Sequence, residues 1–337
     1  MKTTALFSLP LLLLFFAPAG ADPYRWQIAG TFNHTDYGTY SEDNSGLFAA
    51  TYYLRPVDDD LGPRKIAPFL NRSSRISVSA LRTEHESDFL TFLPDPGVAS
   101  IYSLQASSRS YALAGQKVWR ESGWIAGGNL VVMDPPESFF YAPDTHAYGI
   151  VGGKYIAQST MITASFGTSH ADTTTVITGL APGQLFYGLA YQPQFPYELR
   201  SSSDTESAAV AVMHVGGSGN WRYAISAKAE TVRRESRSQS GPVAGSNPPA
   251  NVSVFQLNLR HKHFDIKAEW FPTDRLGIHL AYETQKDTTT DYRVELGTHW
   301  FFRPRTAVEF VIARVEHVFS GSISEPDTAQ VRFLGRF

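Results

Sequence analysis

The sequence has no cysteine, no second long apolar run and no strong excess of charge of either sign. Without cysteine, a chain of 337 residues cannot be held by disulfides, so its stability must come from a large hydrogen-bonded or well-packed structure. A formal net charge of -3 does not indicate a nucleic-acid-binding protein. Beyond the N-terminal segment, no window holds the roughly 18 apolar residues of a membrane helix. A long helical period is also missing, which leaves strands as the main candidate elements.

The first residues have the pattern of a secretory signal peptide. Lys2 precedes an apolar run over residues 5–17, and Ala19-Gly20-Ala21 then gives the small-residue pattern of a cleavage site. The run is too short and too interrupted by proline to span a bilayer as a helix. We therefore predict a signal peptide over residues 1–21 and a mature domain over residues 22–337.

Alternation of apolar and polar residues dominates the rest of the chain. In residues 291–302 the even-numbered positions are mostly apolar or aromatic, whereas Arg293, Glu295 and His299 are odd-numbered. In a β-strand these two sets face opposite sides. The same period predicts fourteen strands, over residues 24–33, 46–55, 74–84, 100–114, 122–133, 145–156, 160–170, 205–215, 221–230, 252–271, 276–285, 291–302, 306–318 and 328–337.

The connections between these segments alternate in length. Bacterial barrels have short turns on one side and long loops on the other. Two links depart from this rule, because residues 56–73 are long where a short turn is expected and residues 286–290 are short where a long loop is expected. The apolar parity changes around His261, which predicts a bulge there. Residues 171–204 could hold an extra hairpin, which gives sixteen strands as the alternative.

A soluble sandwich and a transmembrane barrel both fit alternation alone. Aromatic residues at the ends of the apolar face favour the barrel, since such side chains gather where a membrane meets water. An export signal without cysteine and an even number of strands favour a closed sheet, which has no exposed edge. We therefore predict an all-β, antiparallel, up-and-down transmembrane barrel. Its predicted lipid-facing girdle consists of Trp26, Trp221, Tyr292, Trp300, Phe302 and Phe337.

Two stretches resemble known outer-membrane proteins. The chain ends in QVRFLGRF, which is similar to the terminal-strand signature by which the barrel assembly machinery of Gram-negative bacteria recognises its clients. Residues 52–80, YYLRPVDDDLGPRKIAPFLNRSSRISVSA, resemble the general porin family of Gram-negative outer membranes. In that family a strand runs into a Pro/Asp turn and an Ala-Phe-Leu-Asn/Asp-Arg segment, which Pro68 interrupts here. The resemblance implies an outer-membrane barrel passing small solutes, and it explains the long link at 56–73.

The charged face should line the interior, because an Arg or Lys at the bilayer midplane costs about 2–4 kcal/mol. The predicted pore-lining residues are Arg25, Arg55, Arg75, Arg109, Lys154, Arg222, Lys228, Lys267, Glu269, His279, Glu283, Arg293, Glu295, His299, Glu309 and Arg332. Basic groups outnumber acidic ones in this set, and rings of Arg and Lys favour anions. The sequence thus predicts a mild anion preference. The alternative is that the charges pair across strands and brace the wall.

The long link over residues 171–204 contains a candidate constriction. Phe186, Tyr187, Tyr191 and Phe195 lie in it, and the link could fold inward to narrow the pore or cover the rim. Both interpretations fit the sequence.

Groups with catalytic or metal-binding residue types are weaker candidates. Ser169, His170 and Asp172 include the residue types of a catalytic triad, but neighbours on a strand point to opposite faces. The acidic and histidine group at residues 85–88 has no second ligand cluster at a recognisable spacing. Residues 58–60 lack the spaced ligands of a calcium loop and are expected in a solvated turn. The sequence therefore predicts no metal and no cofactor.

The predicted function is a passive, non-enzymatic outer-membrane channel for small hydrophilic solutes. Its expected partners are outer-membrane lipid, those solutes and the barrel assembly machinery, with no nucleic acid. The alternatives are a barrel enzyme of lipase or protease type and a closed barrel whose loops bind a partner. Neither the oligomeric state nor the solute follows from the sequence.

Overall fold

The computed structural model describes eleven stretches of the chain. They are residues 23–36, 41–92, 99–134, 144–177, 185–186, 189–190, 197–218, 221–242, 253–286, 290–317 and 327–337. The predicted signal peptide over residues 1–21 lies outside the described residues. No helix in the described stretches is long and apolar enough to cross a bilayer.

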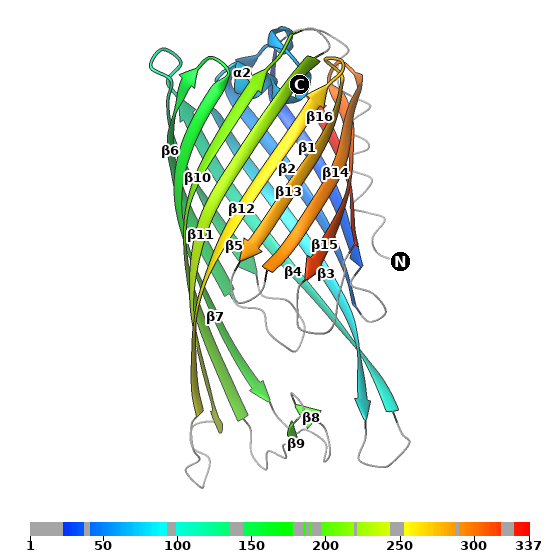
Figure 1. The fold of residues 1–337 in the computed structure, drawn as a ribbon. Helices are drawn as coiled ribbons and strands as arrows, with labels where there is room; N and C mark the ends of the chain where they lie inside the picture. Colours follow the sequence, from blue (N-terminus) through cyan, green and yellow to red (C-terminus); the bar gives the residue numbers. More distant parts are fainter. Residues whose placement is uncertain are drawn as a thin grey trace.

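Fourteen antiparallel strands form one closed barrel, which confirms the predicted fold class (Figure 1). Each strand pairs with its neighbour in sequence, and β1 pairs with β16 to close the sheet. The strands are β1 (Tyr24–Asp36), β2 (Ser41–Val57), β3 (Arg75–Phe92), β4 (Ala99–Val118), β5 (Trp124–Asp134), β6 (Asp144–Ala157), β7 (Thr160–Ile177), β10 (Tyr197–Gly216), β11 (Arg222–Pro242), β12 (Ser253–Phe271), β13 (Leu276–Lys286), β14 (Thr290–Arg303), β15 (Thr306–His317) and β16 (Asp327–Arg336).

The alternative of sixteen barrel strands is wrong. The extra pair in the link over 171–204 is β8 (Leu185–Phe186) with β9 (Leu189–Ala190), and these form a separate two-stranded sheet. Neither is hydrogen-bonded into the barrel. Two residues per strand bury too little surface to extend a wall of strands that are ten or more residues long.

Several strands are longer than the alternation predicts. The segment expected over 221–230 is β11, which continues to Pro242, and β3 and β4 continue together below the barrel body in Figure 1. Both faces of β11 are polar in its second half, so the period of two is lost from the sequence although the backbone pairing with β10 is unbroken. Alternation of apolar and polar residues therefore predicts only the part of each strand that lies in the apolar band, and it does not predict the polar ends of the longer strands.

All links at one end of the barrel are short except one. Strands β4 and β5, β6 and β7, β10 and β11, β12 and β13, and β14 and β15 are joined there by turns of a few residues, and the C-terminus lies at the same end (Figure 1). The exception is the link over residues 58–74 between β2 and β3. The link between β2 and β3 is therefore the one long connection at the short-turn end, and it contains short helical turns.

The outward face of the barrel is apolar through its middle. Leu280 and Leu296 are directly opposed on β13 and β14 and are about half exposed, whereas Ala281 beside them is buried. All six tryptophans of the chain are exposed and lie close to the short-turn end: Trp26, Trp119, Trp124, Trp221, Trp270 and Trp300. Phe302 is exposed beside Trp300, while Tyr292 and Phe337 are partly buried. Such a tryptophan belt is the arrangement expected where a bilayer meets water.

The bulge predicted near His261 is absent. The pairing of β12 with β11 runs from Phe271 to Ser253 without a register shift. Its pairing with β13, in contrast, covers only residues 262–270. The change of apolar parity thus falls where β12 leaves its β13 partner, and it reflects a change of surroundings rather than an extra residue.

We predict that a charge on the outward face destabilises the barrel. Leu296→Arg places a guanidinium in the apolar band and should lower the free energy of unfolding of the barrel in liposomes by about 2–4 kcal/mol. Urea titration followed by heat-modifiable migration on gels measures the change. Ser226→Arg is the matched control, because it adds the same side chain at a position of β11 that faces the interior of the barrel. Equal losses in both variants would contradict the assignment of the faces.

Candidate functional site

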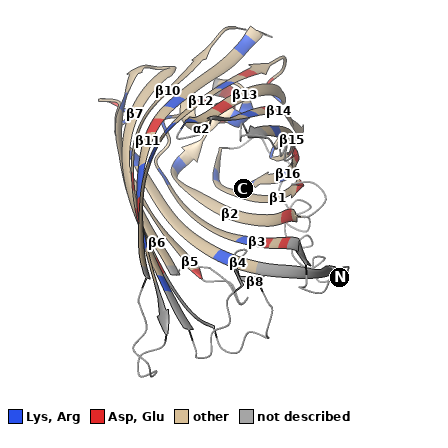
Figure 2. Ribbon diagram, turned by 60° about the horizontal axis from the view of Figure 1, so that its bottom comes forward, with Lys and Arg blue, Asp and Glu red and all other residues tan. Residues whose placement is uncertain are grey.

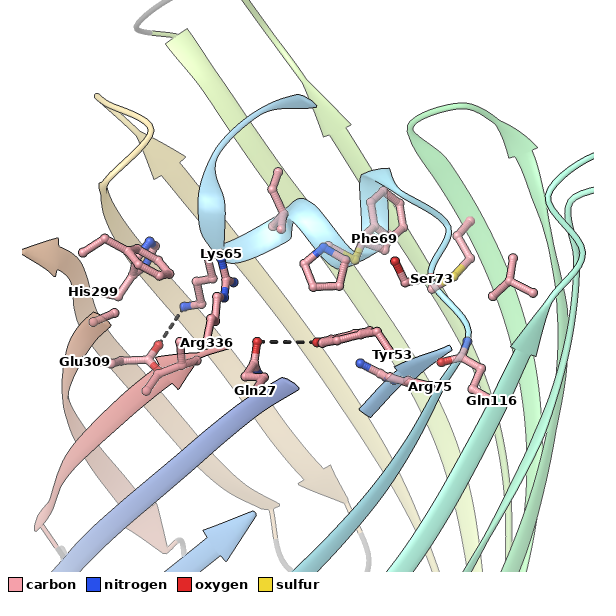
Figure 3. Close-up of a pocket in the computed structure, with 18 of the residues that line it drawn as sticks. Gln27, Tyr53, Lys65, Phe69, Ser73, Arg75, Gln116, His299, Glu309 and Arg336 are labelled. Atoms are coloured by element: carbon pink, nitrogen blue, oxygen red, sulfur yellow. Dashed lines mark hydrogen bonds and ion pairs between the residues drawn. The ribbon is translucent and has the colours of Figure 1, made fainter. Parts of the chain in front are cut away.

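Residues 58–73 form an inner segment that lies inside the barrel at the short-turn end (Figures 1 and 3). It contains two 3-10 turns, η1 (Asp59–Leu61) and η2 (Arg64–Ile66), and one turn of α-helix, α2 (Ala67–Leu70). The Asp58 carboxylate caps η1 by accepting a hydrogen bond of 2.9 Å from the Asp60 N–H. Asn71 closes the segment, because its side-chain amide donates to the carbonyl oxygens of Asp58 and Ala67.

Apolar contacts fix the inner segment to opposite sides of the wall. Ala67 is fully buried in a cluster with Tyr24, Tyr53 and Val57 from β1 and β2. Ile66 packs in a second cluster with Val215, Ala224 and Phe271 from β10, β11 and β12. Phe69 packs on a third, formed by Val118, Ile125 and Tyr155 from β4, β5 and β6. The segment therefore bridges the lumen rather than lying along one strand.

Hydrogen bonds and one ion-pair cluster complete this attachment. Lys65 Nζ lies 2.8 Å from Glu269 Oε1 on β12 and 2.7 Å from Glu309 Oε1 on β15. Figure 3 shows the contact with Glu309. The Tyr155 hydroxyl donates to the carbonyl oxygen of Phe69 at 3.1 Å. Arg72 has a positive φ of 49°, and its guanidinium donates to the carbonyls of Arg120 and Ala157. These contacts hold a backbone conformation that a non-glycine residue rarely adopts.

Arg336, the last residue of β16, is the most deeply buried charge at this end. Its side chain is 1% exposed, and its Nη1 donates to Asp59 Oδ1 at 3.0 Å while Nη2 donates to the carbonyl oxygen of Arg64 at 2.6 Å. Its guanidinium also lies over the rings of Tyr24 and Phe301. Burial raises the pKa of the Asp59 carboxyl, and Arg336 acts against that shift. The expectation of a solvated turn at residues 58–60 is wrong at Asp59, because the chain folds back into the barrel.

A network of acidic and histidine side chains lines the wall beneath Lys65. His299 Nδ1 lies 3.0 Å from the Glu269 carboxylate, and His279 Nε2 lies 2.9 Å from Glu295. Lys267 and Arg293 lie 3.6 and 3.3 Å from the same Glu295. Blue and red segments lie side by side on this part of the wall in Figure 2. The charges are therefore largely matched, as the bracing interpretation of the sequence expected.

Two glycines make room for the two histidines. Gly277 is the direct cross-strand partner of His299, and Gly297 is the partner of His279. A Cβ atom on either glycine would overlap the facing imidazole ring. Both rings are almost completely buried, and each occupies the space that a side chain on the opposite glycine would need. The sequence contained the signal, a Gly-x-His in one strand and a second in the next, but only the register shows that they interlock.

A cavity of about 330 Å³ lies beneath the inner segment. Lys65, Phe69 and Ser73 face it from the inner segment, and Arg75 and Gln116 face it from the wall (Figure 3). The other residues that line it are Gln27, Tyr53, Ile66, Pro68, Val118, Tyr155, Met161, Met213, His299, Phe301, Ala307, Glu309, Arg332, Leu334 and Arg336. The volume is in the range of pockets that hold small molecules.

Most of the predicted pore-lining residues have inward parity, which means that they alternate along their strand with the exposed apolar residues of the outer face. Arg75, His299, Glu309 and Arg332 line the cavity, and Arg222 pairs with Asp274 in a turn at the short-turn end. Arg55 is exposed near the same end. The other members with inward parity are Lys228, Lys267, Glu269, His279, Glu283, Arg293 and Glu295.

Arg25, Arg109 and Lys154 are placed differently from the prediction. A register shift between Tyr24 and Trp26 turns Tyr24 inward, and Arg25 instead donates to the Tyr52 hydroxyl on the exposed side. Tyr24 and Arg25 therefore depart from the predicted alternation, because the irregularity changes which face each residue occupies.

The other two corrections concern strands with little apolar contrast. Arg109 is exposed and shares its parity with Tyr111 and Leu113, which are on the outward face. Lys154 is also exposed, and its ammonium lies 5.1 Å from the ring centre of Trp124. A long basic side chain near a membrane interface can reach water from the lipid side, so its charge alone does not place it in the lumen. The basic excess of the interior is smaller than predicted.

The candidate constriction falls mainly outside the described residues. Tyr187, Tyr191 and Phe195 lie outside them, and Phe186 is in β8. Within the described part of the chain, the inner segment narrows the barrel instead. The long link at 56–73 was visible in the sequence, but its length alone did not show which way it folds.

The catalytic and metal candidates do not assemble. His170 is held between Asp204 and Asp172, with nitrogen–oxygen distances of 2.7 and 2.8 Å, on an exposed face. Ser169 has the opposite parity, so the residues do not form a triad. His85 pairs with Asp43 across β2 and β3 at 2.6 Å. No group of three or more His, Asp and Glu residues among those described is arranged to hold a metal.

Comparison with solved structures supports the fold at low sequence identity. The outer membrane protein Omp33 of Acinetobacter baumannii is 13% identical, with a TM-score of 0.54 over 94% of this chain and 100% of that chain. A mutant of TodX, described as a monoaromatic hydrocarbon channel, is 11% identical, with a TM-score of 0.51 over 99% of this chain and 93% of that chain. No family model and no curated protein matches the sequence. The chain thus has the fold of outer-membrane β-barrels.

We predict that Lys65 holds the inner segment in place. Lys65→Met removes the cation that Glu269 and Glu309 share and should loosen residues 58–73 by about 1–3 kcal/mol, because each carboxylate then loses a charged donor. Hydrogen–deuterium exchange of this segment in detergent should become faster. Lys286→Met, at the exposed end of β13, is the control. Unchanged exchange in Lys65→Met would show that the apolar clusters alone suffice.

The interlocked glycine and histidine residues give a second prediction. Gly297→Ala forces the His279 ring away from the wall and should destabilise the barrel by about 1–3 kcal/mol. Gly46→Ala is the control, because a Cβ atom there meets no atom within 4 Å. Urea midpoints of the two variants measure the difference. A Gly297→Ala protein as stable as Gly46→Ala would mean that the His279 ring moves freely.

Proposed function

We propose that this protein is an outer-membrane channel for the passive diffusion of small hydrophilic solutes, with a mild preference for anions. The observation that carries the proposal is the division of the barrel into an apolar outer face and an inner face of polar and charged side chains around a cavity. A closed sheet satisfies its backbone hydrogen bonds internally, which the hydrocarbon of a membrane requires. The resemblance of residues 52–80 to the general porin family supports the same assignment.

The direction of the barrel follows from its connections. Bacterial outer-membrane barrels have short turns on the periplasmic side. The short-turn end, with the inner segment and the tryptophans, then faces the periplasm. In this proposal residues 1–21 direct export and the C-terminal strand is presented to the barrel assembly machinery. The lipid contacts are made by the exposed face that carries Trp26, Trp221, Trp300 and Phe302.

The expected anion preference is mild because most inward charges are paired. Glu295 is shared by His279, Lys267 and Arg293, and Glu230 is paired with Lys228. Paired charges cancel at a distance, so a passing ion responds chiefly to cations with no such partner. A wall of this kind discriminates weakly between ions of opposite sign.

Two alternatives remain outcomes of the experiment. A barrel enzyme would need a nucleophile next to a base, and His170 is instead occupied by two carboxylates. A closed barrel that binds a partner through its loops would not conduct. The channel is favoured because the cavity and the charged wall lie inside the barrel, where a solute would pass.

Planar-bilayer recording tests the proposal. The purified protein should give stable currents that scale with salt concentration, with a reversal potential in a salt gradient displaced toward anions. Arg293→Glu combined with Arg222→Glu should shift that potential toward cation selectivity, because both residues have inward parity. Arg109→Glu, on the outward parity of β4, should leave it unchanged.

Each result discriminates. Absence of current from folded, heat-modifiable protein would refute the channel. Current with an unchanged reversal potential in the double variant would place Arg293 and Arg222 outside the ion path.

A further inference from the structure

The cavity beneath the inner segment has one cation that is not neutralised within the described residues. Among its charged lining, Lys65 is held by Glu269 and Glu309, and Arg336 is held by Asp59. Arg332 Nη1 lies 3.7 Å from Glu309. No described carboxylate forms an ion pair with Arg75, which lines the same cavity. The cavity therefore has a net positive charge that is centred on this guanidinium.

Amide and hydroxyl groups surround Arg75. Gln116 is its direct cross-strand partner on β4, Tyr53 is its partner on β2, and the Tyr53 hydroxyl donates to Gln27 Oε1 (Figure 3). The Ser73 hydroxyl lines the cavity, is buried and has no hydrogen-bond partner among the described residues. The wall and the inner segment thus place amide and hydroxyl groups around the cavity beside Arg75. The fork of N–H donors on a guanidinium matches the two oxygens of a carboxylate.

One part of the cavity lining is apolar. Phe69 lies against the Tyr155 ring with centroids 5.3 Å apart, and Val118, Met161 and Met213 line the cavity beside them. Methionine and aromatic side chains adapt to apolar groups of varied shape. A solute that binds Arg75 through its carboxylate would therefore have an apolar surface available for the rest of the molecule.

We propose that this cavity is a binding site for a small organic monocarboxylate with an apolar end, with Arg75 as the carboxylate-binding residue. This inference rests on the proposed channel function, which would bring such a solute to the site. One guanidinium without an ion-pair partner among the described residues favours a single negative charge, because a second charge would be buried without a partner. The volume of about 330 Å³ limits the solute to a small molecule.

Calorimetric titration of the purified full-length protein in detergent tests the site, with benzoate as the probe. Benzyl alcohol is the uncharged counterpart of similar shape, and acetate is the counterpart without the apolar end. Benzoate should bind more tightly than either. Arg75→Gln should weaken benzoate binding about tenfold or more, since a charge-assisted bidentate contact is lost. Arg109→Gln, which removes an exposed guanidinium from the outward face, should bind as the natural sequence does.

A second variant keeps the test decisive if Arg75→Gln does not fold. Gln116→Glu leaves the Arg75 guanidinium in place and supplies it with a carboxylate from the neighbouring strand. Because this carboxylate competes with benzoate for Arg75, benzoate binding should weaken as much as in Arg75→Gln. Folding of each variant is checked by heat-modifiable migration.

Three results would overturn the site: no benzoate binding, equal binding of benzoate and benzyl alcohol, or full binding by folded Arg75→Gln or Gln116→Glu. Acetate that binds as tightly as benzoate would refute the role of the apolar side. Bilayer recordings separate this outcome from the channel itself. Currents without benzoate binding would preserve the channel and refute the site, whereas Arg75-dependent binding without current would preserve the site and refute the channel.

Discussion

The hydrogen-bonded closure of β1 onto β16 is the constraint on which the rest of this structure depends. Backbone N–H and C=O groups have no partner in hydrocarbon, so a sheet that meets lipid must leave no edge unpaired. Once the sheet is closed, each strand has one face outside and one inside. The alternation of Leu280 with His279 and Ala281 then becomes a division between lipid contact and lumen.

The closed wall also explains why charged residues can be buried at the short-turn end. Arg336 and Glu269 are each less than a tenth exposed, and each has partners from a different element. Buried ions are tolerated only when they are paired and hydrogen-bonded. The inner segment supplies Lys65 and Asp59 for this purpose, so the same contacts that satisfy the wall keep the segment inside the barrel. Apolar packing of Ala67 and Ile66 adds to that attachment.

Predictions from the sequence were wrong where the alternation of residue types does not reveal which face of the strand a side chain occupies. Arg109 and Lys154 lie on strands whose two faces differ little in polarity, so a basic residue gave no information on direction. Tyr24 and Arg25 exchange faces at a bulge, which alternation does not reveal. The change of parity around His261 had the opposite meaning, since it marks the end of pairing with β13 within an unbroken strand.

The sequence by itself predicted the class of fold, fourteen barrel strands with sixteen as the alternative, and the direction of most charged side chains, because the strand period of two couples polarity directly to a face. It also showed that the link at 56–73 is too long for a turn. Only the tertiary structure decided that this link enters the barrel, that Gly277 and Gly297 receive the two histidine rings, and that Arg75 lacks an ion-pair partner among the described residues. These features depend on contacts between side chains of different strands and of the inner segment, and no pattern within a single strand encodes such contacts.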